Sequence, residues 1–232
     1  MAITIAVTNQ KGGVGKTTTS VNVAYFLAKA GKRTLLIDFD PQGNASSGLG
    51  IAKNDVSVTI SEVITGQASV RSAIIPTEHK HLSIVVAASY LANTEVELGQ
   101  SEGRFTRLKQ AVKEIDEEFD FIIIDSPPSL SLLTVNALIA ANYILLPVQA
   151  EFYALEGLGQ LLETMKLIRK GLNPDLELMG VLPTMMDART SLSGQVYDEI
   201  VKYFPDKVFE TSIPRNIRLA EAPSHGLPVG AY

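Results

Sequence analysis

The sequence contains no cysteine among its 232 residues. It therefore forms no disulfide framework and offers no thiolate nucleophile. An iron–sulfur cluster bound by cysteines of this chain is excluded for the same reason. A reducing compartment suits such a chain, although the composition alone does not prove one.

Long apolar runs and an excess of positive charge are also missing. No apolar run approaches the ~18 residues of a membrane-spanning helix. The first residues enter a strand-like segment, Ile3 to Val7, without a charged leader, so we expect no signal segment. The formal net charge is −5, so any contact with nucleic acid needs a local basic patch rather than attraction of the whole molecule.

What the sequence does contain is an alternation of strand and helix patterns. With 46% hydrophobic and 19% charged residues it is typical of a globular protein. Strands are expected at Ile3–Thr8, Arg33–Asp40, Leu82–Ala87, Phe119–Ser126, Tyr143–Val148 and Leu176–Pro183. Helices are expected at Lys16–Ala30, Arg104–Glu118, Leu130–Ala140, Leu155–Lys170 and Ser191–Tyr203. This alternation predicts an α/β fold, a doubly wound and mostly parallel sheet flanked by helices, in one domain over residues 1–232. Short helices are expected between Gly43 and Pro76.

The segment TNQKGGVGKTTTS, Thr8 to Ser20, ends as a phosphate-binding loop ends. Gly15-Lys16-Thr17 complete the pattern G-x-x-x-x-G-K-[ST] between a strand and a helix, but Gln10 occupies the place of its first glycine. Glycines allow backbone N–H groups to approach phosphate closely at a helix N-terminus. Lys16 is expected at the β- and γ-phosphates and the Thr17 hydroxyl at Mg²⁺. The alternative is a glycine-rich turn without a ligand.

The stretch KGGVGKTT resembles the deviant Walker A motif of the ParA/MinD/nitrogenase-iron-protein group of ATPases. This group accepts another residue at the place of Gln10 and carries an extra lysine at the place of Lys11. The resemblance implies that Lys11 reaches across a dimer to the partner chain's nucleotide, where a cation stabilises charge on the transferring phosphoryl group. A solvated surface lysine is the alternative. The predicted phosphate contacts are Lys11, Gly12, Gly13, Val14, Gly15, Lys16, Thr17 and Thr18.

Two later strands end in carboxylates. Asp38 and Asp40 stand at the carboxyl end of the second strand, where ligands of parallel α/β sheets bind. Their D-x-D-P-Q pattern resembles the second motif of the ParA family, which implies that Asp40 orients or activates the attacking water and that Asp38 supports the Mg²⁺ site. Asp125 ends the apolar run FIIID in the Walker B layout, which places an Asp at Mg²⁺ directly or through water. Loop or helix capping is the alternative for Asp38 and Asp125.

Three motifs in the right order extend the resemblance over nearly the whole chain, Ile3 to about Pro228. They identify the chain as similar to short chromosomal, Soj-like members of the ParA group. The resemblance implies an ATPase with ATP and Mg²⁺, in which Lys11, Lys16 and Asp40 act in catalysis and Thr17, Asp40 and Asp125 hold the metal. It further implies an ATP-dependent homodimer, nonspecific double-stranded DNA as a partner, and hydrolysis stimulated by a ParB-like adaptor. Such a protein segregates or positions a chromosome, plasmid or other cargo and is cytoplasmic and nucleoid-associated.

Near the end of the chain, the resemblance implies an adenine pocket at Thr184, Met185 and Pro214, with Met186 nearby. Apolar packing explains such Met and Pro residues equally well. The predicted DNA contacts are Arg189 and Arg218, with Arg215 and Lys202 as additions to the patch. Sequence-independent phosphate contact needs only accessible cations, and an isolated arginine is otherwise a solvated surface residue.

Other readings of the same motifs are a membrane-cycling ATPase of the MinD type and a non-hydrolysing nucleotide-dependent switch. MinD-type proteins end in a basic amphipathic helix that lies on the bilayer. This sequence ends in GLPVGAY, so no membrane partner is expected. Members of the ParA group typically continue with a further helix. We therefore expect the chain to lack the family's last C-terminal helix, which bears on dimer stability and on DNA affinity.

Overall fold

The computed structural model describes residues 1–151, 158–187 and 189–232. Its strands form one seven-stranded sheet in the order β3-β4-β2-β5-β1-β6-β7, and every pair except β3–β4 is parallel. The strands are β1 (Ile3–Val7), β2 (Thr34–Asp38), β3 (Ile74–Pro76), β4 (Leu82–Val85), β5 (Phe121–Asp125), β6 (Tyr143–Gln149) and β7 (Glu177–Thr184).

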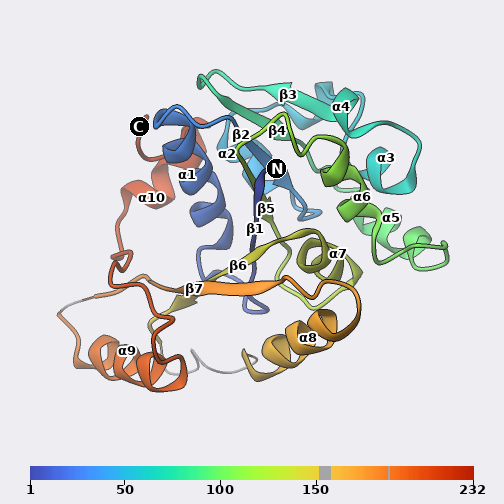
Figure 1. Cartoon of the computed structure of the whole chain (residues 1–232). Helices are drawn as coiled ribbons and strands as arrows, with labels where there is room; N and C mark the ends of the chain where they lie inside the picture. Colours follow the sequence, from blue (N-terminus) through green and yellow to red (C-terminus); the bar gives the residue numbers. More distant parts are fainter. Residues whose placement is uncertain (152–157, 188) are drawn as a thin grey trace.

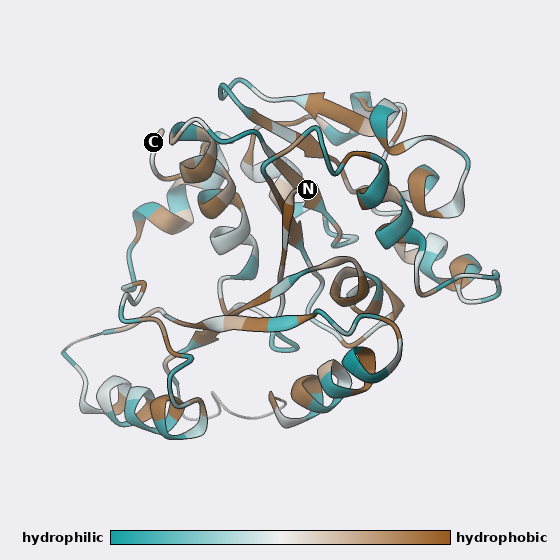
Figure 2. Ribbon diagram, viewed as in Figure 1, coloured by the Kyte–Doolittle hydropathy of each residue, from teal (hydrophilic) through white to brown (hydrophobic). Residues whose placement is uncertain are grey.

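Helices cover both faces of this sheet (Figure 1). They are α1 (Lys16–Lys29), α2 (Asn44–Gly48), α3 (Ile60–Thr65), α4 (Val70–Ala73), α5 (Leu91–Leu98), α6 (Arg107–Glu114), α7 (Leu132–Ala140), α8 (Leu158–Gly171), α9 (Ser191–Tyr203) and α10 (Arg218–Glu221), with short 3₁₀ turns η1 (Lys53–Asp55) and η2 (Ala222–His225). The central strands are mostly apolar, and α8 and α9 each show a hydrophobic and a hydrophilic side (Figure 2). Buried side chains form one cluster on each face of the sheet. No helix in the described ranges is both long and apolar enough to cross a bilayer.

The register of β5 brings three strand ends together. Within the sheet β5 lies between β1 and β2, and its last residue, Asp125, is opposite Val7 on one side and Asp38 on the other. The loop that resembles a phosphate-binding loop follows Val7 directly. Because parallel strands present their carboxyl ends at one edge, this pairing gathers the predicted motifs at one place.

The predicted fold class is confirmed, and each of the six expected strands is present. The helix expected at Ser191–Tyr203 has these bounds, and short helices occur between Gly43 and Pro76 as expected. The predicted start of another helix, at Leu155, lies outside the described residues. The sequence analysis missed β3, a three-residue antiparallel edge strand that ends in proline, and α5, whose sequence LANTEVEL is too short and too polar for a clear helical period.

The C-terminal segment folds back onto α1 and α2. The Asn22 side chain accepts the N–H of Val229 at 2.8 Å and donates to the carbonyl of Thr18 at 2.8 Å. Gly226, at φ +67°, crosses directly over Gly50, and a Cβ at Gly226 would stand only 2.6 Å from the Gly50 Cα. This close crossing of two glycine backbones fixes where the C-terminal segment lies beside the predicted site.

Gly226→Ala is therefore expected to destabilise the fold. The added methyl group clashes with backbone and the residue needs a left-handed conformation, which together cost about 2–4 kcal/mol. The melting temperature is expected to fall by roughly 5–10 °C. Gly194→Ala is the matched control, because Gly194 lies in the middle of α9 with nothing within 4 Å of its added Cβ. That helical substitution is expected to be neutral or to stabilise by up to about 1 kcal/mol. Equal melting temperatures for the two variants contradict the close crossing.

Candidate active site

The loop between β1 and α1 has the backbone of an anion cradle. Gly13 and Gly15 have φ values of +76° and +89°, a left-handed conformation that favours glycine. An added Cβ at Gly13 meets nothing within 4 Å, and one at Gly15 meets only the Thr184 side chain at 3.9 Å. Gly15 is the N-cap of α1, and no side chain caps the helix there. Because no side chain caps them, the first-turn N–H groups are available to an anion such as phosphate.

Lys16 lies at the first turn of α1 and is buried, with 6% of its surface exposed. Its ammonium group donates to the carbonyl of Lys11 at 2.9 Å and so lies inside the curve of the loop. Burial lowers the pKa of Lys16, while the negative charges of Asp125 and Asp40 act to raise it. A buried ammonium group beside a cradle of N–H groups is suited to a multiply charged anion.

Asp125 is fully buried at the end of β5 and is held by two hydroxyl groups of α1. Thr17 donates to one carboxylate oxygen at 2.8 Å and Ser20 to the other at 2.8 Å. Burial raises the pKa of Asp125, and the charge of Asp38 raises it further. The hydrogen bonds from Ser20 and Thr17 act in the opposite direction and lower this pKa. Ser20 was missed by the sequence analysis, although its position three residues after Thr17 places both on one face of the helix.

Asp38 and Asp40 have different surroundings. One oxygen of Asp38 accepts the backbone N–H of Ser46 at 2.8 Å and its hydroxyl at 2.7 Å. Burial raises the pKa of Asp38, and its hydrogen bonds from Ser46 act against this shift. The Asp40 carboxylate, 7% exposed, accepts the N–H of Gln42 at 2.9 Å. Asp38 thus anchors α2, as in the capping alternative given for it above, and its support of the Mg²⁺ site stays a prediction. Asp40 stands on the turn beyond the strand.

The oxygen groups at this edge fit Mg²⁺. Hydroxyl and carboxylate oxygens are the hard ligands that this ion prefers, and it is commonly held by one or two protein groups together with substrate phosphates and water. No group of three or more His, Cys, Asp or Glu side chains that could enclose a metal occurs in residues 1–151, 158–187 and 189–232. The site therefore suits a metal shared with a phosphate ligand. Its candidate ligands are Thr17, Asp40 and Asp125, with Asp38 behind them.

Lys11 points to a different partner. Its ammonium group forms an ion pair with the carboxylate of Glu151, which follows the end of β6, and the two side chains are 32% and 40% exposed. The backbone N–H of Lys11 donates to the Asn9 side chain at 3.0 Å. Glu151 was not predicted, because it lies 140 positions from Lys11 and no local sequence pattern indicates this pair.

The three residues predicted for adenine do come together. Thr184, Met185 and Pro214 line a hollow of about 230 Å³ that also touches Gly15. The Thr184 hydroxyl donates to the carbonyl of Val14 at 2.8 Å, so it braces the loop. Met185 has a φ of +54°, an uncommon conformation for a long side chain.

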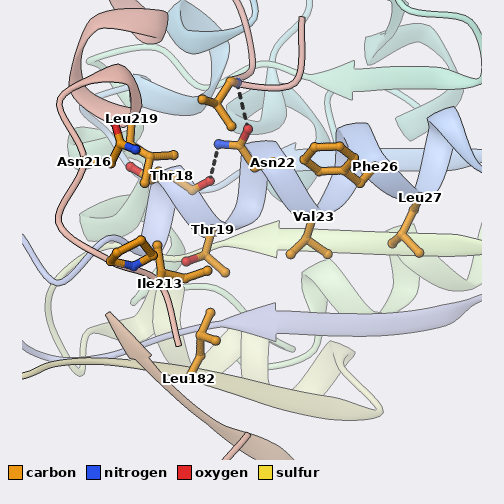
Figure 3. A pocket seen from close by; sticks show the side chains of 12 residues that line it. Thr18, Thr19, Asn22, Val23, Phe26, Leu27, Leu182, Ile213, Asn216 and Leu219 are labelled. Carbon is orange, nitrogen blue, oxygen red and sulfur yellow. Dashed lines mark hydrogen bonds between the residues drawn. The ribbon is translucent and has the colours of Figure 1, made fainter. Parts of the chain in front are cut away.

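Beside this hollow lies a larger apolar pocket of about 600 Å³ between α1 and the C-terminal segment (Figure 3). The two share residues of α1 and of the C-terminal segment. Asn22 lines the larger pocket, and both of its hydrogen bonds are visible in the view. The residues that line the large pocket are Thr18, Thr19, Asn22, Val23, Phe26, Leu27, Leu182, Ile213, Pro214, Asn216, Leu219 and Val229.

The predicted DNA contacts are all exposed but do not share one element. The Arg189 side chain is 86% exposed and donates twice to the Asp187 carboxylate, at 2.8 and 2.7 Å. This pairing lowers the pKa of Asp187 to about 2, with a smaller contribution from Arg215. Arg189 and Arg215 thus act on the same carboxylate. Arg218 begins α10 and Lys202 lies in the last turn of α9.

Comparison with known proteins adds a family context. Residues 2–178 match a family model described as an AAA domain. The chain is 55% identical over 228 residues to the sporulation initiation inhibitor protein Soj of Bacillus subtilis, covering 98% of this chain and 90% of that protein. It is 47% identical over 232 residues to the chromosome-partitioning ATPase Soj of Treponema pallidum, covering 100% and 90%. Among solved structures, cobyrinic acid a,c-diamide synthase from Mycobacterium smegmatis with bound ADP and magnesium has a TM-score of 0.89 and 37% identity, covering 97% of this chain and 93% of that one.

Proposed function

The chain belongs to the Soj/ParA family of chromosome-partitioning ATPases, and from this premise we propose that ATP and Mg²⁺ close two copies into a dimer that binds DNA without sequence preference. The chain is an ATPase, with ATP as substrate and Mg²⁺ as cofactor. In the proposed cycle a ParB-like adaptor stimulates hydrolysis, which releases the DNA. The cycle segregates or positions a chromosome, plasmid or other cargo at the nucleoid.

One observation carries the assignment of the site: the Thr17 hydroxyl, at the start of the helix that the glycine loop opens, is bonded to the Asp125 carboxylate at 2.8 Å. This contact supports a shared metal position between the loop and β5. Backbone N–H groups of residues 12–18 and the Lys16 ammonium then bind the β- and γ-phosphates. Bound Mg²⁺ supplies charge neutralisation on the phosphate oxygens. Thr184, Met185 and Pro214 enclose the base in this proposal.

Asp40 is proposed to orient the attacking water. Its carboxylate is nearly buried, stands two residues beyond Asp38, and is directed by the N–H of Gln42. An oriented carboxylate can accept the proton of a water molecule as the water attacks. Asp38 does not compete for this role, because its carboxylate already accepts two hydrogen bonds from Ser46.

Lys11 is proposed to stabilise charge at the partner chain's nucleotide. In the single chain its ammonium group is paired with Glu151, so closure of the dimer exchanges one anion for another. Both side chains are partly exposed, so the net free energy lost when the pair breaks is small. Glu151 thus competes with the partner's phosphates for Lys11.

DNA binding is proposed for Arg189, Arg215, Arg218 and Lys202, which are all exposed. The net charge of −5 opposes binding by the whole molecule, so these cations must act as a local patch. A dimer presents two copies of the patch, and the second contact then gains from effective concentration. ATP can therefore control DNA affinity through dimer closure.

Replacing the proposed water-orienting carboxylate separates chemistry from binding. Asp40→Ala is expected to lower the turnover rate roughly 100-fold or more, because the group that accepts the proton is lost. Its affinity for a fluorescent ATP analogue is expected to stay near that of the wild type. Lys16→Ala is the companion variant and is expected to lose nucleotide binding, since the buried ammonium group is removed. Phosphate release and fluorescence titration measure the two effects, and unchanged turnover of Asp40→Ala contradicts the proposed role.

Weakening the ion pair of Lys11 tests the competition with Glu151. Glu151→Gln removes the charge but keeps the shape, so we expect ATP-dependent dimers at several-fold lower protein concentration, on the scale of an exposed charge pair of ~1 kcal/mol. Sedimentation velocity with a slowly hydrolysed ATP analogue measures this shift. The control is Glu163→Gln, which removes an exposed carboxylate of α8. A dimerisation constant that is unchanged or weaker in Glu151→Gln refutes the competition.

DNA binding is tested by fluorescence anisotropy of a labelled duplex with the ATP analogue at about 50 and 200 mM salt. Arg189→Ala is expected to weaken binding and to reduce the salt dependence by about one counterion per lost phosphate contact. Asp187→Asn is expected to strengthen binding several-fold, because it releases Arg189 and Arg215 from a competing carboxylate. Asp175→Asn, at an exposed position before β7, is the matched charge control. Absent or salt-insensitive binding of the wild type overturns the DNA-binding proposal.

A further inference from the structure

Lys53 makes an unusual contact with the turn that carries Asp40. Its ammonium group donates to two successive backbone carbonyls, that of Gln42 at 2.9 Å and that of Gly43 at 3.2 Å. Lys53 makes no ion pair with a carboxylate in the described part of the chain. Its charge is therefore directed at main-chain oxygens rather than at an acidic side chain.

These carbonyls belong to the turn that directs the proposed water-orienting carboxylate. The N–H of Gly43 donates to the Asp40 carbonyl at 2.8 Å, which closes the turn. The N–H of Gln42 donates to the Asp40 carboxylate at 2.9 Å. Both backbone groups of Gln42 are thus used, the N–H by Asp40 and the carbonyl by Lys53. The contacts form one chain from the ammonium group of Lys53 to the carboxylate of Asp40.

The stem of Lys53 also packs tightly against this turn. Gly43 has a φ of +63°, and a Cβ there would stand 2.7 Å from the Lys53 Cδ and 2.8 Å from the carbonyl oxygen of Ala87. The turn therefore lies between the lysine stem and the segment that follows β4. A solvated surface lysine has neither this packing nor two carbonyl acceptors.

We propose that Lys53 is a positioning residue for hydrolysis: it clamps the turn from Asp40 to Gly43 and so fixes the direction of the Asp40 carboxylate. This inference rests on the proposed role of Asp40. Without the clamp the turn gains conformational freedom, and the carboxylate spends less time in the direction that orients water. A small misplacement of a catalytic group is enough to lower a rate severalfold to 100-fold. The phosphate loop follows another strand, β1, whereas both hydrogen bonds of Lys53 are made to the turn that follows β2.

The test compares Lys53→Met, which keeps most of the apolar stem and loses the donors, with the wild type and with Lys53→Arg. Lys53→Met is expected to lower kcat for ATP about tenfold while KM and the affinity for a fluorescent ATP analogue change less than about twofold. Lys53→Arg is expected to restore at least half of the lost rate, because a guanidinium group can also donate to two carbonyls. Lys80→Met, at an exposed position in the turn between β3 and β4, is the matched control and is expected to leave both constants unchanged.

A wild-type kcat for Lys53→Met overturns the clamp. So does a variant in which kcat and nucleotide affinity fall together with the melting temperature and Arg fails to restore them, because that pattern marks general destabilisation. Asp40→Ala is measured in parallel. If Asp40→Ala loses turnover and Lys53→Met does not, the clamp alone is wrong. If Asp40→Ala keeps its turnover, the proposed role of Asp40 is wrong and the clamp falls with it.

Discussion

The burial of the Asp125 carboxylate at the meeting point of three parallel strands is the constraint on which the site depends. The register of β5 leaves Asp125 beside Asp38 on one side and beside the start of the glycine loop on the other. Burial raises the pKa of both carboxyl groups, and the charge of Asp38 raises the pKa of Asp125 further. Hydrogen-bond donors on α1 and α2 offset part of the free-energy cost of burying these carboxylates. The helices that flank the site are thereby tied to the same carboxylates that the chemistry needs.

This arrangement makes the site a junction between distant parts of the chain. The α1 helix contributes the hydroxyl groups of Thr17 and Ser20 to Asp125, and its outer side receives the C-terminal segment through Asn22. The α2 helix is anchored by Asp38 and is crossed by the same C-terminal segment at Gly226. Two sets of contacts, through α1 and through α2, therefore join the carboxylates to the C-terminal segment. That segment also lines the hollow proposed for the base and carries Arg218, one of the proposed DNA contacts.

The sequence alone was sufficient for the fold class and for the part of the site that follows local patterns. Lys16, Thr17 and Asp125 could be found because each stands at a fixed offset from the end of an apolar strand, and parallel strands end at one edge. Glu151 and Lys53 could not be found in this way. Their contacts depend on how loops from different strands approach one another, and no periodicity or short motif encodes that distance. The short antiparallel strand β3 was missed for a related reason, since its pairing with β4 rather than its own residues makes it a strand.

The positions of the acidic groups suggest how cations of an acidic chain can control phosphate binding. Lys11 is paired with Glu151, and Arg189 with Asp187, so each of these two proposed functional cations meets an anion of its own chain first. Both pairs involve partly or largely exposed side chains, where the net energy of an ion pair is small. A phosphate oxygen from a nucleotide or from DNA can displace a carboxylate in such a pair, because it accepts the same charge-assisted hydrogen bonds. For a nucleotide, backbone N–H donors of the phosphate loop also bind the phosphate. In this proposal the internal anion sets a threshold: we expect weak or isolated phosphates not to displace it, and two sites brought together in the proposed dimer to do so. The affinity for nucleotide or DNA then depends on the difference in free energy between the cation–phosphate and the cation–carboxylate interaction. Because these two interactions are similar, the difference is small, and we propose that the nucleotide state controls it.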